Sequence, residues 1–318
     1  MHISEATTQG VASVASPTVE SLTAPLRIPR RIMPFFRNSS LPNPGRLEEL
    51  KKEASSVLSP DVFEGARFEF NKTLTQKFAL LHNVSLAGGQ AGTYEFGAHL
   101  GDERTLLASR IDMAGRLNGR LNAQLNDAVL VRLQAAVAPE SAGSGNTFKA
   151  DVDYKGGDFC AGGYFMGGGL LGASYLQSVS EGLAVGCEGF YHTLNKKVRG
   201  GAGAARYVWG SKGENVATAK VGTFGNGAVE LAYQRKVSEK VSLATEMQYY
   251  HNQFCQFGLG YEFKLRTAVF KGLIQSDTTC SAVLEEHIQP GINLVLSGSL
   301  NHKKQDYKFG CGLTIGGA

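Results

Sequence analysis

The sequence RLNGRLNAQLN, residues 116–126, decides the fold because apolar and polar residues alternate along it without a break. Side chains on a β-strand point to opposite faces with a period of two, so Leu117, Leu121 and Leu125 share one face and the Arg, Asn and Gln residues share the other. At 3.6 residues per turn the same leucines would scatter around a helix. The pattern therefore predicts a strand with one dry face and one wet face.

The same alternation runs from Phe63 to Ile315 and is interrupted at turns by Gly, Asn, Asp, Ser and Pro. About 19 such rows fit into this length, at roughly ten residues for a tilted strand plus a short turn. A sheet of so many strands leaves open edges unless it closes, and closure at this size encloses a wide lumen. We predict an all-β fold, a transmembrane β-barrel of about 19 strands with polar rows toward the lumen and apolar rows toward lipid.

Other all-β architectures fit the sequence less well. A sandwich has fewer strands and longer crossovers, and a propeller would show a repeat of about 40 to 45 residues, which this chain lacks. No run reaches the about 18 apolar residues that a membrane helix needs, and this leaves open a membrane protein built from strands. A soluble all-β binding protein stays as another class, and it would purify without detergent.

The composition argues against nucleic acid, metal and enzymatic chemistry. The net charge of +4 comes without a basic run in the body of the chain, so no nucleic-acid partner is expected. The 5 cysteines are widely spread and form no CxxC pair, so we expect reduced thiols, no metal site and no cofactor. The phosphate-loop lookalike Gly167-x-Gly169-x-x-Gly172 has no following helix, and the histidines lie in separate rows without a paired nucleophile. We expect no enzyme.

The N-terminal part divides into two regions. Residues 1–42 are rich in Ser, Thr and Pro, and we interpret them as a flexible, uncleaved arm because the prolines would break the amphipathic helix of a transit peptide. Residues 43–60 predict an amphipathic helix, with Asn43 as its cap and Pro44 at the first helical position. Its apolar face consists of Leu47, Leu50, Ala54 and Val57. Residues 61–318 are assigned to the barrel.

Several motifs of the chain resemble those of one known family. They are PGRLEEL at residues 44–50, FEGARF at 63–68, FKGLI at 270–274 and LNH at 300–302. In this order they resemble the channel-forming subunit of the protein translocase of the mitochondrial outer membrane, in the mitochondrial porin superfamily. The resemblance implies a barrel closed by parallel pairing of its first and last strands, with the helix inside the lumen. It also implies passage of unfolded precursor proteins, and a complex with a receptor subunit, small single-helix subunits and further copies of the chain.

The last strand and the polar rows supply two further sets of candidate residues. The last strand resembles the sorting signal of mitochondrial barrel proteins, which here consists of Lys308, Gly310, Cys311, Leu313 and Ile315. Because presequences are basic and amphipathic, acidic residues on the lumen face would attract them at long range. The candidates are Glu69, Glu95, Asp151, Asp153, Glu188, Glu246 and Glu262. The competing interpretation is that each acid only solvates the wall or pairs across strands.

A metabolite porin of the same fold is the alternative function. Both classes share the barrel and the internal helix, so the strand count does not separate them. The long stretch before the helix and the match at residues 44–50 favour the protein-conducting channel, because neither resembles the short N-terminus of porin.

Overall fold

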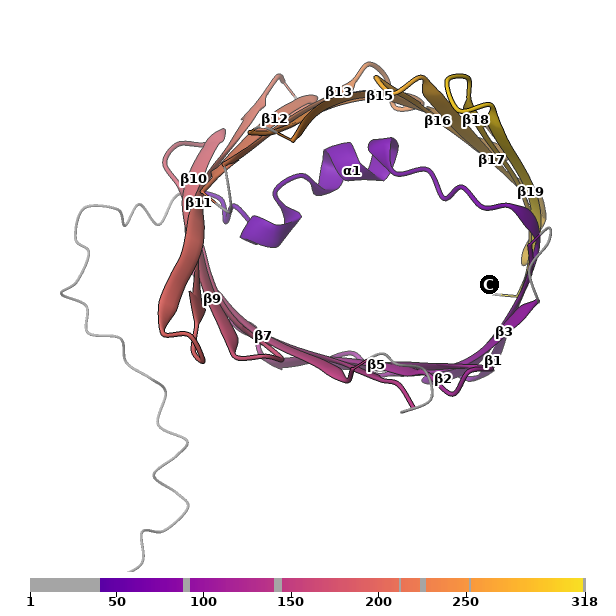
Figure 1. Ribbon diagram of the computed structural model, residues 1–318, viewed down its shortest axis with the longest axis horizontal. Helices are drawn as coiled ribbons and strands as arrows, with labels where there is room; N and C mark the ends of the chain where they lie inside the picture. The colour runs from indigo at the N-terminus through magenta and orange to yellow at the C-terminus, as the bar shows by residue number, and fades with distance from the viewer. Residues whose placement is uncertain are drawn as a thin grey trace, which may run out of the picture. The chain divides into compact units, whose positions relative to one another are not determined.

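The structure is a computed structural model that describes residues 41–87, 92–139, 145–211, 213–223, 227–251 and 253–316. The predicted flexible arm, residues 1–42, lies outside the described residues apart from its last two positions. The described residues form one sheet of 19 strands and a short helical segment. The sheet curves into a closed ring, and the helical segment lies inside it (Figure 1).

The strands follow one another as a meander of short hairpins. Their bounds are β1 Gly65–Thr75, β2 Phe78–Leu86, β3 Thr93–Gly101, β4 Thr105–Asp112, β5 Leu117–Asn126, β6 Val129–Val137, β7 Thr147–Lys155, β8 Phe159–Met166, β9 Leu170–Ser178, β10 Leu183–His192, β11 Lys197–Trp209, β12 Asn215–Gly222, β13 Ala228–Lys236, β14 Val241–Tyr250, β15 Phe254–Lys264, β16 Ala268–Gln275, β17 Thr279–Gln289, β18 Ile292–Asn301 and β19 Asp306–Ile315. Each strand pairs antiparallel with the next, as the period-two sequence pattern predicts.

The ring closes where the first strand meets the last. β1 and β19 pair in parallel, from Gly65 opposite Gly310 to Phe70 opposite Ile315. An odd number of strands in an up-and-down meander brings the first and last strands together in the same direction, so the closing pair must be parallel. The predicted barrel and the parallel closure implied by the family resemblance are both confirmed.

The two faces of the wall follow from the strand pairings, because residues opposite each other share a face. Arg132 of β6 contacts Glu48 of the internal segment, so it faces the lumen, and its β5 partner Asn122 faces the lumen too. The alternate residues of β5 point outward, and Leu117 and Leu125 are 43% and 69% exposed there. From Asn118 to Gln124 this strand therefore carries its Arg, Asn and Gln residues toward the lumen, and its leucines point outward.

The helical part of the chain is shorter than the sequence predicts. In place of a continuous helix, a 3-10 turn η2 spans Leu47–Glu49 and a helix α1 spans Lys52–Leu58. Gly45 has a φ of +80°, outside the helical region, so Pro44 does not begin a helix. The side chain of Asn43 donates to the carbonyl oxygens of Gly156 and Phe159 at 2.8 and 2.9 Å. Asn43 ties the segment to the wall instead of capping a helix.

We call residues 43–63 the inner segment, because they cross the inside of the ring between the β7–β9 wall and β1 (Figure 1). Neither of its described helical pieces is long and apolar enough to cross a membrane.

The closing seam is covered from inside by the end of the inner segment. Ser297 Oγ accepts a hydrogen bond from the Phe63 amide at 3.3 Å and donates one to the Phe63 carbonyl at 2.7 Å. A Cβ at Gly310 would collide with that carbonyl oxygen and with Ser297 Oγ, and a Cβ at Gly312 would lie 3.0 Å from the Phe63 ring. The guanidinium of Arg67 lies 4.2 Å from the centre of the same ring. The glycine of the sorting-signal pattern thus has a structural task in the closed barrel.

Replacing Gly310 by Ala should weaken the seam in barrel protein refolded in detergent, where no sorting machinery acts. The added methyl group overpacks the contact with Phe63, so we expect a loss of about 1 to 3 kcal/mol in the free energy of unfolding. Thermal unfolding measures it. The matched control is Gly298→Ala, whose Cβ would meet the Phe309 ring at an ordinary 3.6 Å, and a change within about 0.5 kcal/mol is expected there. Equal melting of the two variants would contradict the structural task.

Candidate functional site

The candidate site is the lumen with the inner segment packed on one side of it. Two apolar clusters hold the segment against the wall. Leu47 and Leu50 pack with Leu176, Ala184 and Ala204 of β9 to β11. Further along the segment, the second cluster contains Ala54, Val57, Leu58, Ala232 and Ala244, with Leu273 beside it. The four residues that the sequence assigns to the apolar face are all buried, with Val57 at 0% exposure.

Arg132 anchors the first half of the inner segment. Its guanidinium Nη2 lies 3.0 Å from Glu48 of the segment, 3.0 Å from Asp153 and 3.7 Å from Asp151 of β7. Arg132 is 7% exposed and Asp151 is 2% exposed. A buried charge is tolerated only when it is paired, so this cluster depends on all of its members.

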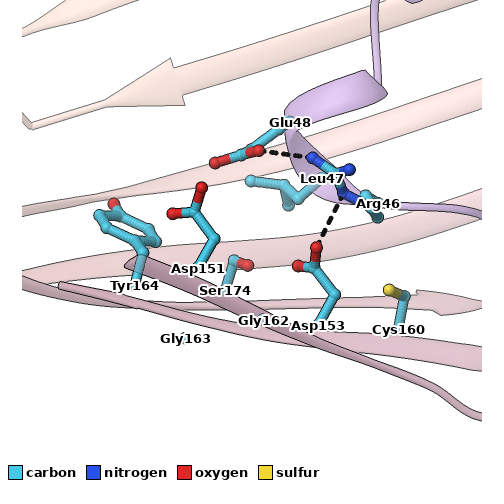
Figure 2. Close-up of a pocket in the computed structure, with 10 residues that line it drawn as sticks. All are labelled: Arg46, Leu47, Glu48, Asp151, Asp153, Cys160, Gly162, Gly163, Tyr164 and Ser174. Atoms are coloured by element: carbon cyan, nitrogen blue, oxygen red, sulfur yellow. Dashed lines mark hydrogen bonds and ion pairs between the residues drawn. The ribbon is translucent and has the colours of Figure 1, made fainter. Parts of the chain in front are cut away.

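Arg46 and Lys149 complete the same cluster. Arg46 lies 2.6 Å from Glu48 and 3.2 Å from Asp153, and Figure 2 shows it between the two carboxylates. Lys149 lies 3.4 Å from Glu48 and 3.2 Å from Asp151. The inner segment and the wall each contribute both acids and bases, so their charges interlock.

The charged neighbours of Glu48 control its titration. Burial opposes ionisation, but the hydrogen bond from Arg132 and the charges of Lys149, Arg132 and Arg46 outweigh burial and lower the pKa of Glu48 from 4.5 to about 2. Glu48 is therefore ionised over the whole physiological pH range.

The second half of the segment is held by β11, β13, β14 and β16. Lys51 Nζ lies 3.2 Å from Glu230 and 2.9 Å from Glu246. Burial works against its charge, yet the hydrogen bond to Glu246 and the charges of both carboxylates raise the pKa of Lys51. Two further contacts are an ion pair of 2.5 Å between Arg206 and Glu53 and a hydrogen bond of 3.0 Å from Lys271 to the Ser56 carbonyl.

The seven acids predicted from the sequence all lie on the lumen face, but they differ in their ion-pair partners. Asp153 and Glu246 pair directly with the inner segment, and Asp151 pairs with Arg132 and Lys149 of the wall, which both contact Glu48 of the segment. Two others pair along the wall: Glu188 lies 2.7 Å from Lys220, and Glu262 lies 3.7 Å from Lys271. Within the described ranges, Glu69 and Glu95 make no ion pair. Pairing across the wall, the competing interpretation, therefore describes four of the seven acids, Asp151, Asp153, Glu188 and Glu262.

The unpaired acids lie outside the part of the wall that packs in the two apolar clusters, and we call their part the open wall. Glu69 and Glu95 line a cavity of about 50 Å³ with Asn83 and Arg110. Glu69 also lines a neighbouring cavity of about 240 Å³ together with Glu285. The last residues of the inner segment, Ser59, Asp61 and Phe63, line the same cavity as Glu69 and Glu285. In the described part of the chain no group of His, Cys, Asp and Glu could hold a metal ion. The open wall thus offers carboxylates to whatever passes through the lumen.

Sequence reasoning missed several residues of the site. Arg132 is the clearest, because a single charge within the otherwise apolar run of β6 is a signal that could have marked it as a paired residue. Lys51, Glu230 and Arg206 carry no such signal, because exposed charges on alternating strands are ordinary. The sorting-signal residues are split by the wall, with Lys308 and Gly310 inside and the three apolar residues outside, and their role in sorting stays a prediction.

A closed wall with a polar lumen and an internal segment tied to it defines a pore-forming β-barrel. The model of the eukaryotic porin family matches residues 43–310. The chain belongs to the eukaryotic porin family.

Several curated relatives align with most of this chain. The "Probable mitochondrial import receptor subunit TOM40-2" of Arabidopsis thaliana is 33% identical, covering 86% of this chain and 91% of its own length. The "Mitochondrial import receptor subunit TOM40 homolog 2" of Drosophila melanogaster is 30% identical, covering 88% and 86%. The TOM40 homolog of Homo sapiens is 30% identical, covering 87% and 79%. Among solved structures, a mutant of Rh. blastica porin aligns at 9% identity with a TM-score of 0.48, covering 75% of this chain and 96% of that one.

Acidification should loosen the inner segment through Glu48. Because its pKa is depressed when the segment is docked, the stabilisation is complete above pH 4.5 and is lost as the pH falls toward 2. We expect the gap in unfolding free energy between the natural protein and Glu48→Gln to be widest above pH 4.5 and to close toward pH 2. Denaturant unfolding at a series of pH values measures this difference in unfolding free energy. A difference that does not change with pH would refute the stabilising role of ionised Glu48.

Removing Arg132 should destabilise the barrel more than removing any unpaired lumen base. Arg132→Gln leaves Glu48, Asp151 and Asp153 with too little positive charge, and we expect a loss of about 3 kcal/mol. Arg120→Gln is the control, because Arg120 faces the same lumen but is exposed. Denaturant unfolding of both variants decides, and equal losses would show that the cluster is not an anchor.

Proposed function

We propose that this chain is the protein-conducting channel of the mitochondrial import translocase and passes unfolded precursor proteins across the outer membrane. The observation that carries the proposal is the alignment at 30 to 33% identity, over most of the chain, with proteins named mitochondrial import receptor subunits. The closed barrel with an internal segment gives that activity a physical route.

The channel works as a passive conduit. The backbone groups of the wall are paired along the strands, so the lumen offers a passing chain side chains rather than an open strand edge. A helix with side chains is about 10 to 12 Å across, and an extended chain is thinner. The inner segment takes up part of the lumen, which restricts transit to unfolded or helical polypeptide.

The outer face and the word "subunit" in the relatives' names support a membrane complex. Alternate residues of the strands place apolar side chains such as Phe68, Val185 and Leu231 on the exposed outer face, as lipid contact requires. By similarity, we propose receptor and small single-helix subunits as partners, together with further copies of this chain. The proposal includes transport through the lumen, in keeping with the match to the eukaryotic porin family, and no chemical reaction.

The open wall supplies the attraction for presequences. Glu69, Glu95 and Glu285 face the lumen without an ion pair in the described residues, whereas most of the other lumen acids are neutralised by neighbours. Presequences are basic, and a low-dielectric wall focuses the field of unpaired carboxylates into the channel. Of the seven acids predicted from the sequence, we therefore keep Glu69 and Glu95, which make no ion pair in the described residues, and we add Glu285.

Neutralising these three acids should weaken the block of the channel by a presequence peptide. In planar bilayers, Glu69→Gln, Glu95→Gln and Glu285→Gln combined should raise the half-blocking peptide concentration by roughly tenfold at low salt, where field effects are largest. The control combines Glu103→Gln, Glu181→Gln and Glu239→Gln, which removes equal charge from exposed hairpins.

The same recordings test the channel assignment itself. Block by presequence peptide supports protein import. Absence of block, with clear anion preference and passage of nucleotides, would instead identify a metabolite porin. Equal block in the lumen and hairpin variants would leave the channel standing but remove the acids from the mechanism.

A further inference from the structure

We propose that the wall beneath the inner segment is a binding trough for the amphipathic basic helix of a precursor, and that the inner segment is its built-in competitor. The inference rests on the proposed function, because it assigns the site at which the transported chain binds. It is argued from the small side chains and the carboxylates of the trough, and from the short helical pieces of the inner segment that now occupies it.

The trough accepts a helix because its wall residues are small. Ala184, Ala204, Ala232 and Ala244 all lie beneath the apolar face of the segment. At Gly260 an added Cβ would stand 3.0 Å from a Leu58 methyl carbon and 3.1 Å from a backbone oxygen of the segment. Strands usually carry large or β-branched residues, so a row of small ones hollows the wall for a helix to lie close.

The trough carries charges of both signs. Arg206 and Lys271 contact Glu53 and the Ser56 carbonyl of the segment, and a pair of carboxylates offers a place for a basic group. Glu230 and Glu246 project from neighbouring strands, and both bind the single ammonium group of Lys51. The segment side of this contact is an amphipathic helix with a lysine beside its apolar face, which is the chemistry of a presequence. A helix that lays its apolar face in a groove is a general mode of peptide recognition.

The present occupant is poorly suited to hold the trough against a longer helix. Its helical pieces contain 3 and 7 residues, and isolated helices below about 12 to 15 residues are marginal in water. Besides the apolar clusters and ion pairs described above, the segment is tethered at both ends, by Asn43 near β7 and β8 and by Phe63 at the seam. A tether gives a high local concentration without strong contacts, so a continuous helix with more apolar area can displace the middle of the segment while the ends stay fixed.

Two variants separate competition from simple anchoring because only one of them should change the block. Lys51→Gln weakens only the occupant, so the half-blocking concentration of presequence peptide should fall about three- to tenfold. Glu230→Gln with Glu246→Gln weakens the trough for the occupant and the peptide alike, so the two effects offset each other and that concentration should change by less than about twofold. If the contact only anchored the segment, both variants would free it and lower the half-blocking concentration by a similar factor.

Lys52→Gln is the matched control for charge. Lys52 is exposed and carries the same positive charge as its neighbour Lys51. If Lys52→Gln lowers the half-blocking concentration as much as Lys51→Gln does, the effect is one of net charge and the trough is refuted.

Hydrogen exchange of the full-length barrel in detergent gives a readout of displacement itself. On adding saturating presequence peptide, amides of residues 50–58 should exchange several-fold faster, because the Ser55 amide loses its bond to the Lys51 carbonyl, now 2.8 Å, together with the rest of the helix. Channel block with unchanged or slower exchange would overturn the competition and leave the import channel intact. Absence of any block would instead overturn the proposed function on which the inference rests.

Discussion

Every backbone N–H and C=O group in the lipid-facing part of this wall needs a partner within the protein, because lipid supplies none. Pairing each strand with its successor satisfies all but the two outermost edges, and β1 with β19 satisfies those. The rest of the structure depends on this closing pair. The tight fit of Phe63 over Gly310 and its bonds to Ser297 fasten the inner segment to that same seam.

Once the ring is closed, the lumen is the only wet surface between the two ends of the strands. The polar residues of every strand therefore point into the lumen, where opposite charges come within ion-pair distance of one another. Arg132 with Glu48 and Lys51 with Glu246 show the result, since each pair joins the inner segment to the wall. Pairs of this kind hold position and register more than they add stability, because burying the charges offsets much of the attraction.

The lumen acids therefore divide into two groups with different tasks. Asp153 and Glu246 pair with the inner segment and Asp151 pairs with its anchor Arg132, whereas Glu69 and Glu95 make no ion pair within the described residues. In the proposed function, the second group is the one that a passing chain meets. The trough joins the two, since its carboxylates bind a lysine that the protein itself supplies.

Local patterns in the sequence were enough to predict the architecture of the barrel. Alternation such as that of residues 116–126 is local, and strand length and turn spacing limit the strand number, so both could be read without coordinates. The apolar face Leu47 to Val57 was readable for the same reason. The tertiary structure was needed to show that the helical part starts only after Gly45, that it is split between Glu49 and Lys52, and which acids are neutralised. The neutralised acids depend on contacts between distant residues, such as Lys51 with Glu246, which is 195 positions away, and no local pattern encodes them.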